Sequence, residues 1–164
     1  AVGLAALGGV LLAGGDAPQA EQCFTEALRV FRALGDQMPN ELLMMQRIAE
    51  SRQRHGTLDA AAEQLDEALA LAQRSLPRWH YITASIELQL GRCLAAAGNF
   101  EQAERHLLAS LEGYARLNGD EHLTTRAVHA ALAELYADWG RGELEAQHRA
   151  RSTQAAVLAP RGAP

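Results

Sequence analysis

A glycine followed by a polar or charged residue recurs along this chain at nearly constant spacing. The pairs are Gly15-Asp16, Gly56-Thr57, Gly98-Asn99 and, more loosely, Gly140-Arg141, and they lie 41, 42 and 42 residues apart. A fixed period of this length is typical of repeat proteins, in which each repeat is one small unit that buries its apolar face against its neighbours. The chain is therefore expected to form a short array of similar units.

Each glycine break lies between two predicted helices. After the first break, apolar residues recur at helical spacing and form one stripe, made of Ala20, Cys23, Phe24, Ala27, Phe31 and Leu34. Asp16 is placed to cap this helix, Pro18 suits its first turn, and Gly35 ends it. Strand-forming residues are sparse, whereas Ala and Leu dominate the composition. The sequence predicts an all-α chain of eight helices in four antiparallel pairs.

The predicted organisation is a single array over residues 1–158, followed by a disordered tail at 159–164. The four pairs are expected at about 1–35, 40–76, 79–118 and 120–158. Asn40 and Asp120 are expected to cap the first helices of their pairs, and Asn99 is expected to form a capping box with Gln102.

The two ends of the array differ in polarity. The last helix is poor in large apolar residues and carries Arg149 where the first and third repeats have Phe24 and Leu107, so it is expected to close the array to water. The first helix is apolar nearly all round, which predicts that it stacks on a preceding repeat, on another copy of the chain or on a ligand. A helical pattern at residue 1 and the lack of an initiating Met also suggest a longer protein.

Composition and motifs argue against several classes of function. The formal net charge is −5 and the arginines are dispersed, so no basic patch for direct nucleic-acid binding is expected. The apolar run at the N-terminus is far shorter than a membrane span and has no basic region before it, so no membrane contact is expected. Two cysteines form no disulfide framework and favour a reduced, cytoplasmic protein. No phosphate-binding loop, nucleophile motif or zinc motif is present, so we predict no enzyme activity, cofactor or metal site.

Several of these residues resemble the tetratricopeptide repeat, whose pattern is W-x2-L-G-x2-Y followed by A-x3-F. The first repeat has Leu4, Leu7, Gly8 and Leu11 and then Ala20 and Phe24, and the third has Leu90, Gly91 and Leu94 and then Ala103 and Leu107. Gly8 and Gly91 are expected where the paired helices pack closely. The period exceeds the usual length of about 34 residues. Together with the stretches "RALGD" and "RLNGD", it resembles the long-repeat subclass found in bacterial transcription regulators, signalling ATPases and kinesin light chains.

The resemblance implies a right-handed superhelix whose first helices line a concave face that binds peptides or protein segments. Candidate groove residues on these helices are Gln46, Arg47, Glu50, Gln53, Arg54, Ser85, Leu88, Gln89, Arg92, Glu134 and Asp138. Arg92 is expected either to bind a partner or to pair with Glu50 or Glu134 of a neighbouring repeat. The favoured function is a non-catalytic interaction module of a larger bacterial regulator. The first alternative is self-association into a homo-oligomer through the apolar N-terminal helix pair. The second, less favoured, is a metal-binding or enzymatic helical domain.

The stretch "AGNFEQAERHLL" concentrates Glu101, Glu104 and His106 and could suggest a metal or proton-transfer site. Glu104 and His106 are two residues apart and do not share a helical face. Acidic residues near the start of a helix also complement its dipole. The sequence therefore predicts that His106 lies on a solvated helix face.

Overall fold

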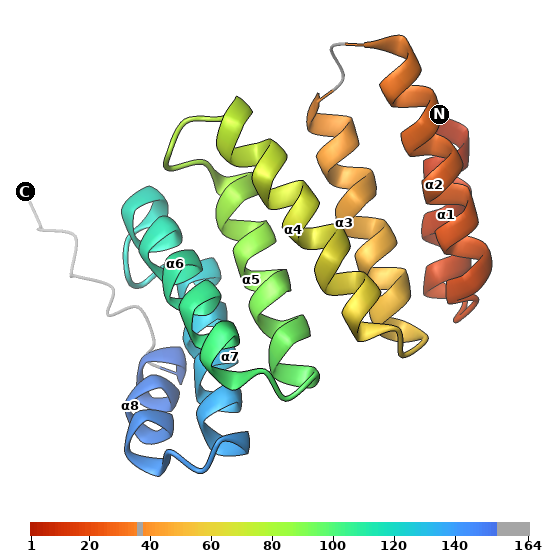
Figure 1. The fold of residues 1–164 in the computed structure, drawn as a ribbon. Coiled ribbons are helices and arrows are strands. Elements are labelled where there is room, and N and C mark those ends of the chain that lie inside the picture. Colours follow the sequence, from red (N-terminus) through yellow and green to blue (C-terminus); the bar gives the residue numbers. More distant parts are fainter. Residues whose placement is uncertain (36–37, 154–164) are drawn as a thin grey trace, which may run out of the picture.

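The computed structural model describes residues 1–35 and 38–153, and within these residues the chain forms eight α-helices. They are α1 (Val2–Ala13), α2 (Ala17–Leu34), α3 (Met38–Arg54), α4 (Leu58–Ser75), α5 (Tyr81–Ala96), α6 (Phe100–Asn118), α7 (Leu123–Asp138) and α8 (Gly142–Thr153). Consecutive helices pack as antiparallel pairs that stack side by side along the array, and α5 also contacts α3 and α7 (Figure 1). The predicted tail at 159–164 lies outside the described residues.

The four glycine breaks share one backbone geometry. Gly15, Gly56, Gly98 and Gly140 have φ values of 90°, 90°, 80° and 74°. In each turn the next N–H donates to the carbonyl five residues earlier, over 2.9, 2.9, 2.9 and 2.8 Å. This arrangement satisfies the free carbonyls at a helix end, and its left-handed backbone favours glycine. The period read from the sequence is thus the period of a repeated helix-ending turn.

The predicted caps are only partly confirmed. The Asp16 carboxylate accepts a hydrogen bond of 3.1 Å from the backbone N–H of Gln19, as expected. Asn99 does precede α6, but its side chain makes no capping bond, so the predicted capping box with Gln102 is wrong. The predicted cap at Asn40 is also wrong, because α3 begins two residues earlier.

Two histidines 42 residues apart cap the first helices of the third and fourth pairs. Nδ1 of His80 accepts from the N–H of Ile82, and Nδ1 of His122 accepts from the N–H of Thr124, both over 3.2 Å. The cap of α7 is therefore His122, and the prediction of Asp120 is wrong. Both bonds require an unprotonated acceptor nitrogen in the imidazole ring.

Small residues bring the paired helices together where the sequence predicted it. A Cβ added at Gly8 would lie 2.7 Å from Cε1 of Phe24, and one added at Gly91 would lie 2.7 Å from Cγ of Leu107. Phe24 and Leu107 are fully buried. We call residues equivalent when they lie one or more whole repeats of 41 or 42 residues apart. By this definition one repeat position is occupied by Phe24, Leu65, Leu107 and Arg149 in the four repeats.

The histidine in "AGNFEQAERHLL" does not lie on a solvated face. Nδ1 of His106 lies 2.6 Å from Oε2 of Glu87, whose residue is only 8% exposed, so that prediction is wrong. Glu104 is also engaged, because its Oε1 accepts from the Tyr136 hydroxyl over 2.7 Å. His106 therefore serves packing within the third pair, and Glu104 serves packing between the third and fourth pairs.

Equivalent positions carry equivalent polar contacts. His129 and His148 are the equivalents of Glu87 and His106, and their Nδ1 atoms lie 2.9 Å apart. Arg52 and Glu21, joined over 2.8 Å, are the equivalents of Tyr136 and Glu104. The first contact joins the helices of one pair, whereas the second joins neighbouring pairs. A repeat position thus fixes where a contact forms, while the side chains decide its chemistry.

The histidine pair predicts a loss of stability in mild acid. Burial is the largest cause that lowers the pKa of both His129 and His148 below 6.5, with the positive charge of Arg151 acting in the same direction and Asp120 partly opposing it at His129. The unfolded chain therefore takes up protons before the folded one, so stability is present above about pH 6.5 and is lost as the pH falls through the lowered pKa values.

Urea unfolding followed at about pH 7.5 and at about pH 5 measures this effect. His148→Gln introduces the residue found at the equivalent position 64 and should flatten the pH dependence. An unchanged pH dependence in that variant would rule out the pair as its source.

Candidate binding groove

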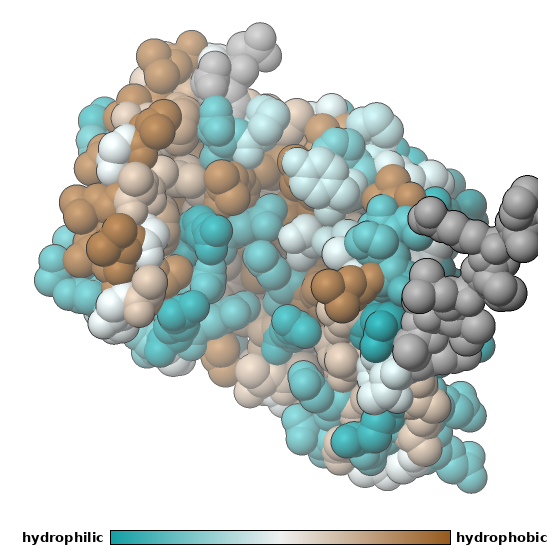
Figure 2. Space-filling view, turned by 180° about the vertical axis from the view of Figure 1, so that it is seen from behind, coloured by the Kyte–Doolittle hydropathy of each residue, from teal (hydrophilic) through white to brown (hydrophobic). Residues whose placement is uncertain are grey.

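The first helices of the pairs, α1, α3, α5 and α7, form one layer of the solenoid, and this layer presents a mixed surface. In Figure 2 the hydrophobic residues gather along the edge formed by α1, whereas hydrophilic residues cover the middle of the face. Two hollows lie on it. The α1–α3 pocket has a volume of about 340 Å³ and the α5–α7 pocket one of about 440 Å³.

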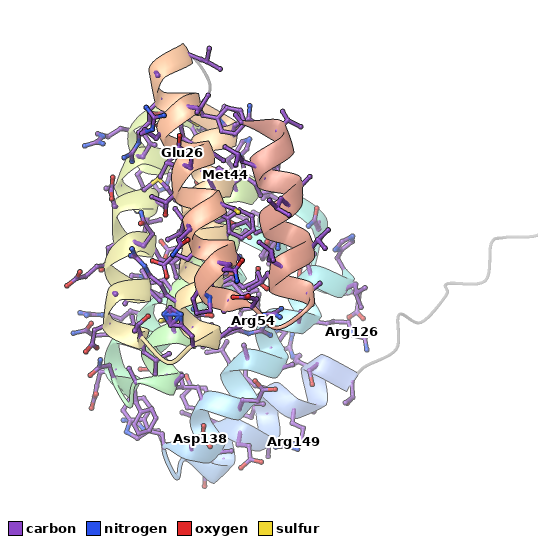
Figure 3. All side chains as sticks on the ribbon, turned by 90° about the vertical axis from the view of Figure 1, so that its right-hand side faces the viewer. Glu26, Met44, Arg54, Arg126, Asp138 and Arg149 are labelled. Atoms are coloured by element: carbon purple, nitrogen blue, oxygen red, sulfur yellow. The ribbon has the colours of Figure 1, made fainter. Side chains whose placement is uncertain are left out.

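The α1–α3 pocket combines apolar walls with charges that are already paired. Its walls include Ala5, Leu12 and Leu43. Glu50 accepts from Arg47 over 2.8 Å and from Arg54 over 2.9 Å, so one carboxylate holds both guanidinium groups. Arg54 also donates to the carbonyl oxygen of Leu12 over 3.1 Å, and Figure 3 shows it close to the C-terminal end of α1. These three charged residues were predicted for the groove, and here they stabilise its wall.

The α5–α7 pocket holds three charged side chains that have no partner in the part of the chain that the structure describes. Arg92 projects from α5, and Glu134 and Asp138 project from α7, and all three are exposed. Within residues 1–35 and 38–153, none of these side chains makes a hydrogen bond or an ion pair. Arg92 therefore does not pair with Glu50 or Glu134, and this alternative from the sequence is wrong. The floor and walls of the pocket are small or apolar and include Ala95, Ala131 and Leu135.

A polar bridge links the two halves of the face. Oε1 of Gln46 on α3 accepts from Ser85 Oγ over 3.4 Å and from Gln89 Nε2 over 3.2 Å, both on α5. The remaining two predicted residues line neither pocket. Leu88 packs against the core, and Gln53 lies near the Cys93 thiol, whose pKa is raised mainly by burial.

The structure thus gathers nine of the eleven predicted groove residues into two pockets and a bridge. The apolar walls at Ala5, Leu12 and Leu43 were not among the predicted site residues. They could have been identified from the sequence, because they lie on the same inward helix stripe as the polar candidates.

Among the described residues, no three His, Cys, Asp or Glu side chains gather as ligands of a metal ion. Within the same ranges no helix combines the length and the apolar character needed to cross a membrane.

Comparison with known families decides the identity of this repeat. A sequence model of the tetratricopeptide repeat matches residues 1–74 and 82–154. The chain belongs to the tetratricopeptide repeat family. The TPR match covers both halves of the array and leaves residues 75–81, around the connection between α4 and α5, unmatched between its two parts. No curated protein matches the sequence.

Solved structures share the TPR fold of this chain. BtubC (BKLC) from P. vanneervenii is similar with a TM-score of 0.83 at 24% identity, covering 91% of this chain and 59% of BtubC. The apo form of RapI gives 0.81 at 15% identity, covering 91% and 53%. Nearly identical TPR-like repeats assigned to a kinesin light chain of Podosopora anserina give 0.78 at 20% identity, covering 94% and 76%. The predicted all-α, TPR-like solenoid is confirmed, and the chain spans little more than half the length of the first two structures.

Proposed function

We propose that this TPR array is a non-catalytic scaffold that binds an extended peptide or protein segment along the layer of α1, α3, α5 and α7. The observation that carries the proposal is the α5–α7 pocket, where Arg92, Glu134 and Asp138 surround about 440 Å³ of open space without ionic partners among the described residues. Charges elsewhere on this face are already paired. Charged groups left free in a concave site are available to a ligand.

The chemistry of the pocket favours a segment with an acidic and a basic side chain close together. The Arg92 guanidinium can donate two parallel hydrogen bonds to a carboxylate. Glu134 and Asp138 lie four residues apart on α7 and so present two carboxylates on one helix face to an ammonium or guanidinium group. A segment held by both helices would couple the third and fourth pairs, and so bias the curvature of the array.

The biological setting proposed for the scaffold is a single array that serves as the interaction segment of a larger cytoplasmic regulator in bacteria. The two free thiols, Cys23 and Cys93, support a reducing compartment. The long period supports the regulator subclass.

The groove is tested with peptides selected from a displayed random library. We expect Arg92→Glu combined with Gln46→Ala to raise the dissociation constant of the selected peptides by about tenfold or more. The reason is that a charge-assisted hydrogen bond contributes about 1.5–3 kcal/mol. The measurement is the dissociation constant by fluorescence anisotropy, with helicity checked by circular dichroism. Arg105→Glu changes an exposed arginine of α6 outside the groove and serves as the matched control. Equal affinity in the groove variant and in this control would rule out binding around Arg92.

A second candidate function, self-association through the N-terminal helix pair, rests on a different observation. Val2, Leu7 and Val10 of α1 are exposed although they are large and apolar. Such a face is expected to bind another surface. Light scattering over a concentration series tests this candidate, and a monomer at every concentration would contradict it.

A further inference from the structure

A pocket of about 430 Å³ lies between the second helices α4 and α6, and we call it the α4–α6 pocket. Its walls come from these two helices, from the N-terminal half of α5 and from the connection between α4 and α5. They include Gln73, Trp79, Thr83, Glu87 and Glu112. No residue of this pocket lines either pocket of the groove, so the two surfaces can be tested separately.

The equivalent place between α2 and α4 is occupied by an arginine side chain. Nη2 of Arg32 on α2 donates to Oε1 of Glu67 on α4 over 2.8 Å. Nε of Arg32 lies 3.6 Å from Oε2 of Glu41 on α3, and its Nη2 lies 4.0 Å from Sδ of Met45 on the same helix. One guanidinium group therefore joins three helices at this place.

The third pair has lost this arginine and both of its carboxylate partners. The equivalents of Arg32, Glu67, Glu41 and Met45 are, in this order, Gln73, Ala109, Thr83 and Glu87. All four replacements line the α4–α6 pocket. The pocket therefore lies where the second pair holds a guanidinium group, and it has gained a carboxylate in place of a thioether.

Two oxygen atoms of this pocket lack hydrogen-bond donors. Glu87 is only 8% exposed, and its Oε2 contacts His106, but its Oε1 makes no hydrogen bond or ion pair among the described residues. Oγ1 of Thr83 is buried and has no hydrogen-bond partner within the same ranges. Buried polar atoms without partners cost free energy, so both oxygens favour a ligand that donates hydrogen bonds.

The arginines at the mouth of the pocket do not supply these donors. Cζ of Arg78 lies 5.0 Å from the centroid of the Trp79 ring, and Cζ of Arg116 lies 4.5 Å from it. Arg116 also pairs with Glu112 over 3.1 Å. Neither arginine pairs with Glu87 in the part of the chain that the structure describes. Both are thus placed against Trp79, and the Glu87 carboxylate stays available.

The fourth pair differs from the third at the same place. There a pocket is lined by Arg151, the equivalent of Ala109, and by His129, the equivalent of Glu87. An arginine of the chain itself is therefore present and the buried carboxylate is absent. Of the three equivalent places, the α4–α6 pocket combines a buried carboxylate with space for a cation.

We propose that the α4–α6 pocket binds the guanidinium group of an arginine side chain carried by a partner protein or peptide. This group takes the place that Arg32 occupies in the second pair. Its planar set of N–H donors suits the two oxygens that lack donors, Glu87 Oε1 and Thr83 Oγ1. The apolar stem of the same side chain packs against Trp79. The proposal is independent of peptide binding in the groove.

The test is a titration with a capped tripeptide that has a central arginine, followed by the NMR signal of the Trp79 indole N–H. We expect this signal to shift and to saturate at millimolar peptide. A matched tripeptide with citrulline, which has a similar shape but no charge, should bind at least about tenfold more weakly. Glu87→Gln should weaken the arginine peptide by a similar factor. Glu101→Gln changes an exposed carboxylate outside the pocket and should leave the dissociation constant unchanged.

Gln73→Arg is a second variant, which leaves the carboxylate in place. It introduces the residue found at the equivalent position 32, so its side chain should enter the pocket from α4 and abolish peptide binding. It remains informative if circular dichroism shows that Glu87→Gln disturbs folding. An indole signal that does not shift, or equal binding of the arginine and citrulline peptides, would overturn the proposal. Tighter binding of free methylguanidinium than of the arginine peptide would overturn the assignment to a partner's side chain. The variants leave the α5–α7 pocket unchanged, so groove binding succeeds or fails separately.

Discussion

Phe24→Ala is expected to lower the free energy of unfolding by about 3–5 kcal/mol, the range found when a buried aromatic side chain is removed. The Phe24 ring is 1% exposed and packs directly on Gly8, which has no side chain to move into the space left behind. The cavity would open between α1 and α2, and α1 is covered on fewer sides than the other first helices. α1 can therefore move toward α2 and fill part of the cavity, so the loss should fall at the lower end of the range.

Urea denaturation followed by circular dichroism measures this loss. Leu108→Ala is the control, because Leu108 lies on a second helix but is 43% exposed. It should change stability by less than about 1 kcal/mol. A Phe24→Ala loss as small as that of the control would show that the Phe24–Gly8 contact does not hold the first pair together.

Gly91→Ala is expected to destabilise the protein by about 1–3 kcal/mol through overpacking, although alanine favours helices. The new Cβ would lie 2.7 Å from Cγ of Leu107 and 3.2 Å from the backbone oxygen of Ala103. The second of these atoms belongs to the helix backbone, so relief requires α5 and α6 to move apart. The second and fourth pairs have Ala49 and Ala133 at the equivalent position, so the close approach that requires glycine is a property of the first and third pairs.

Alanine at Gly9 provides a control for which the expected change in stability has the opposite sign. Gly9 is also inside a helix, but a Cβ placed there meets nothing within 4 Å. Gly9→Ala should therefore stabilise the protein by about 0.5–1 kcal/mol through helix propensity alone. Thermal unfolding of the two variants compares them directly, and a stabilising effect at both sites would contradict the close packing of α5 on α6.

The features that the sequence predicted correctly depend on single residues or on spacing within one helix. A glycine is needed wherever φ is positive, so the turns at Gly15, Gly56, Gly98 and Gly140 could be located from the sequence. The small residue at Gly8 could be predicted for a similar reason, because a fixed motif places it against Phe24.

The features that the sequence did not predict depend on contacts between helices. His106 was assigned to solvent because its partner, Glu87, comes from another helix, 19 residues earlier. The three charges of the α5–α7 pocket have no partners among the described residues for the same reason, since their separation depends on how α5 and α7 are placed. By contrast, Arg47 and Arg54 lie three and four residues from Glu50, a spacing that favours ion pairs within a helix and could have identified them as paired.

Because the last helix, α8, is attached largely by polar contacts, the array is expected to open from its C-terminal end. α8 has no fully buried side chain, and besides the packing of Leu144 against the core it is held to α7 by the contact of His148 with His129 and by a hydrogen bond of 3.0 Å from Arg126 to the Ser152 carbonyl. In a stacked array, an end unit can detach while the rest stays folded. Backbone amides of α8 should therefore exchange with solvent through a lower-energy opening than those of α5. Such fraying would loosen α7, the wall that carries Glu134 and Asp138, while the α1–α3 pocket stays formed.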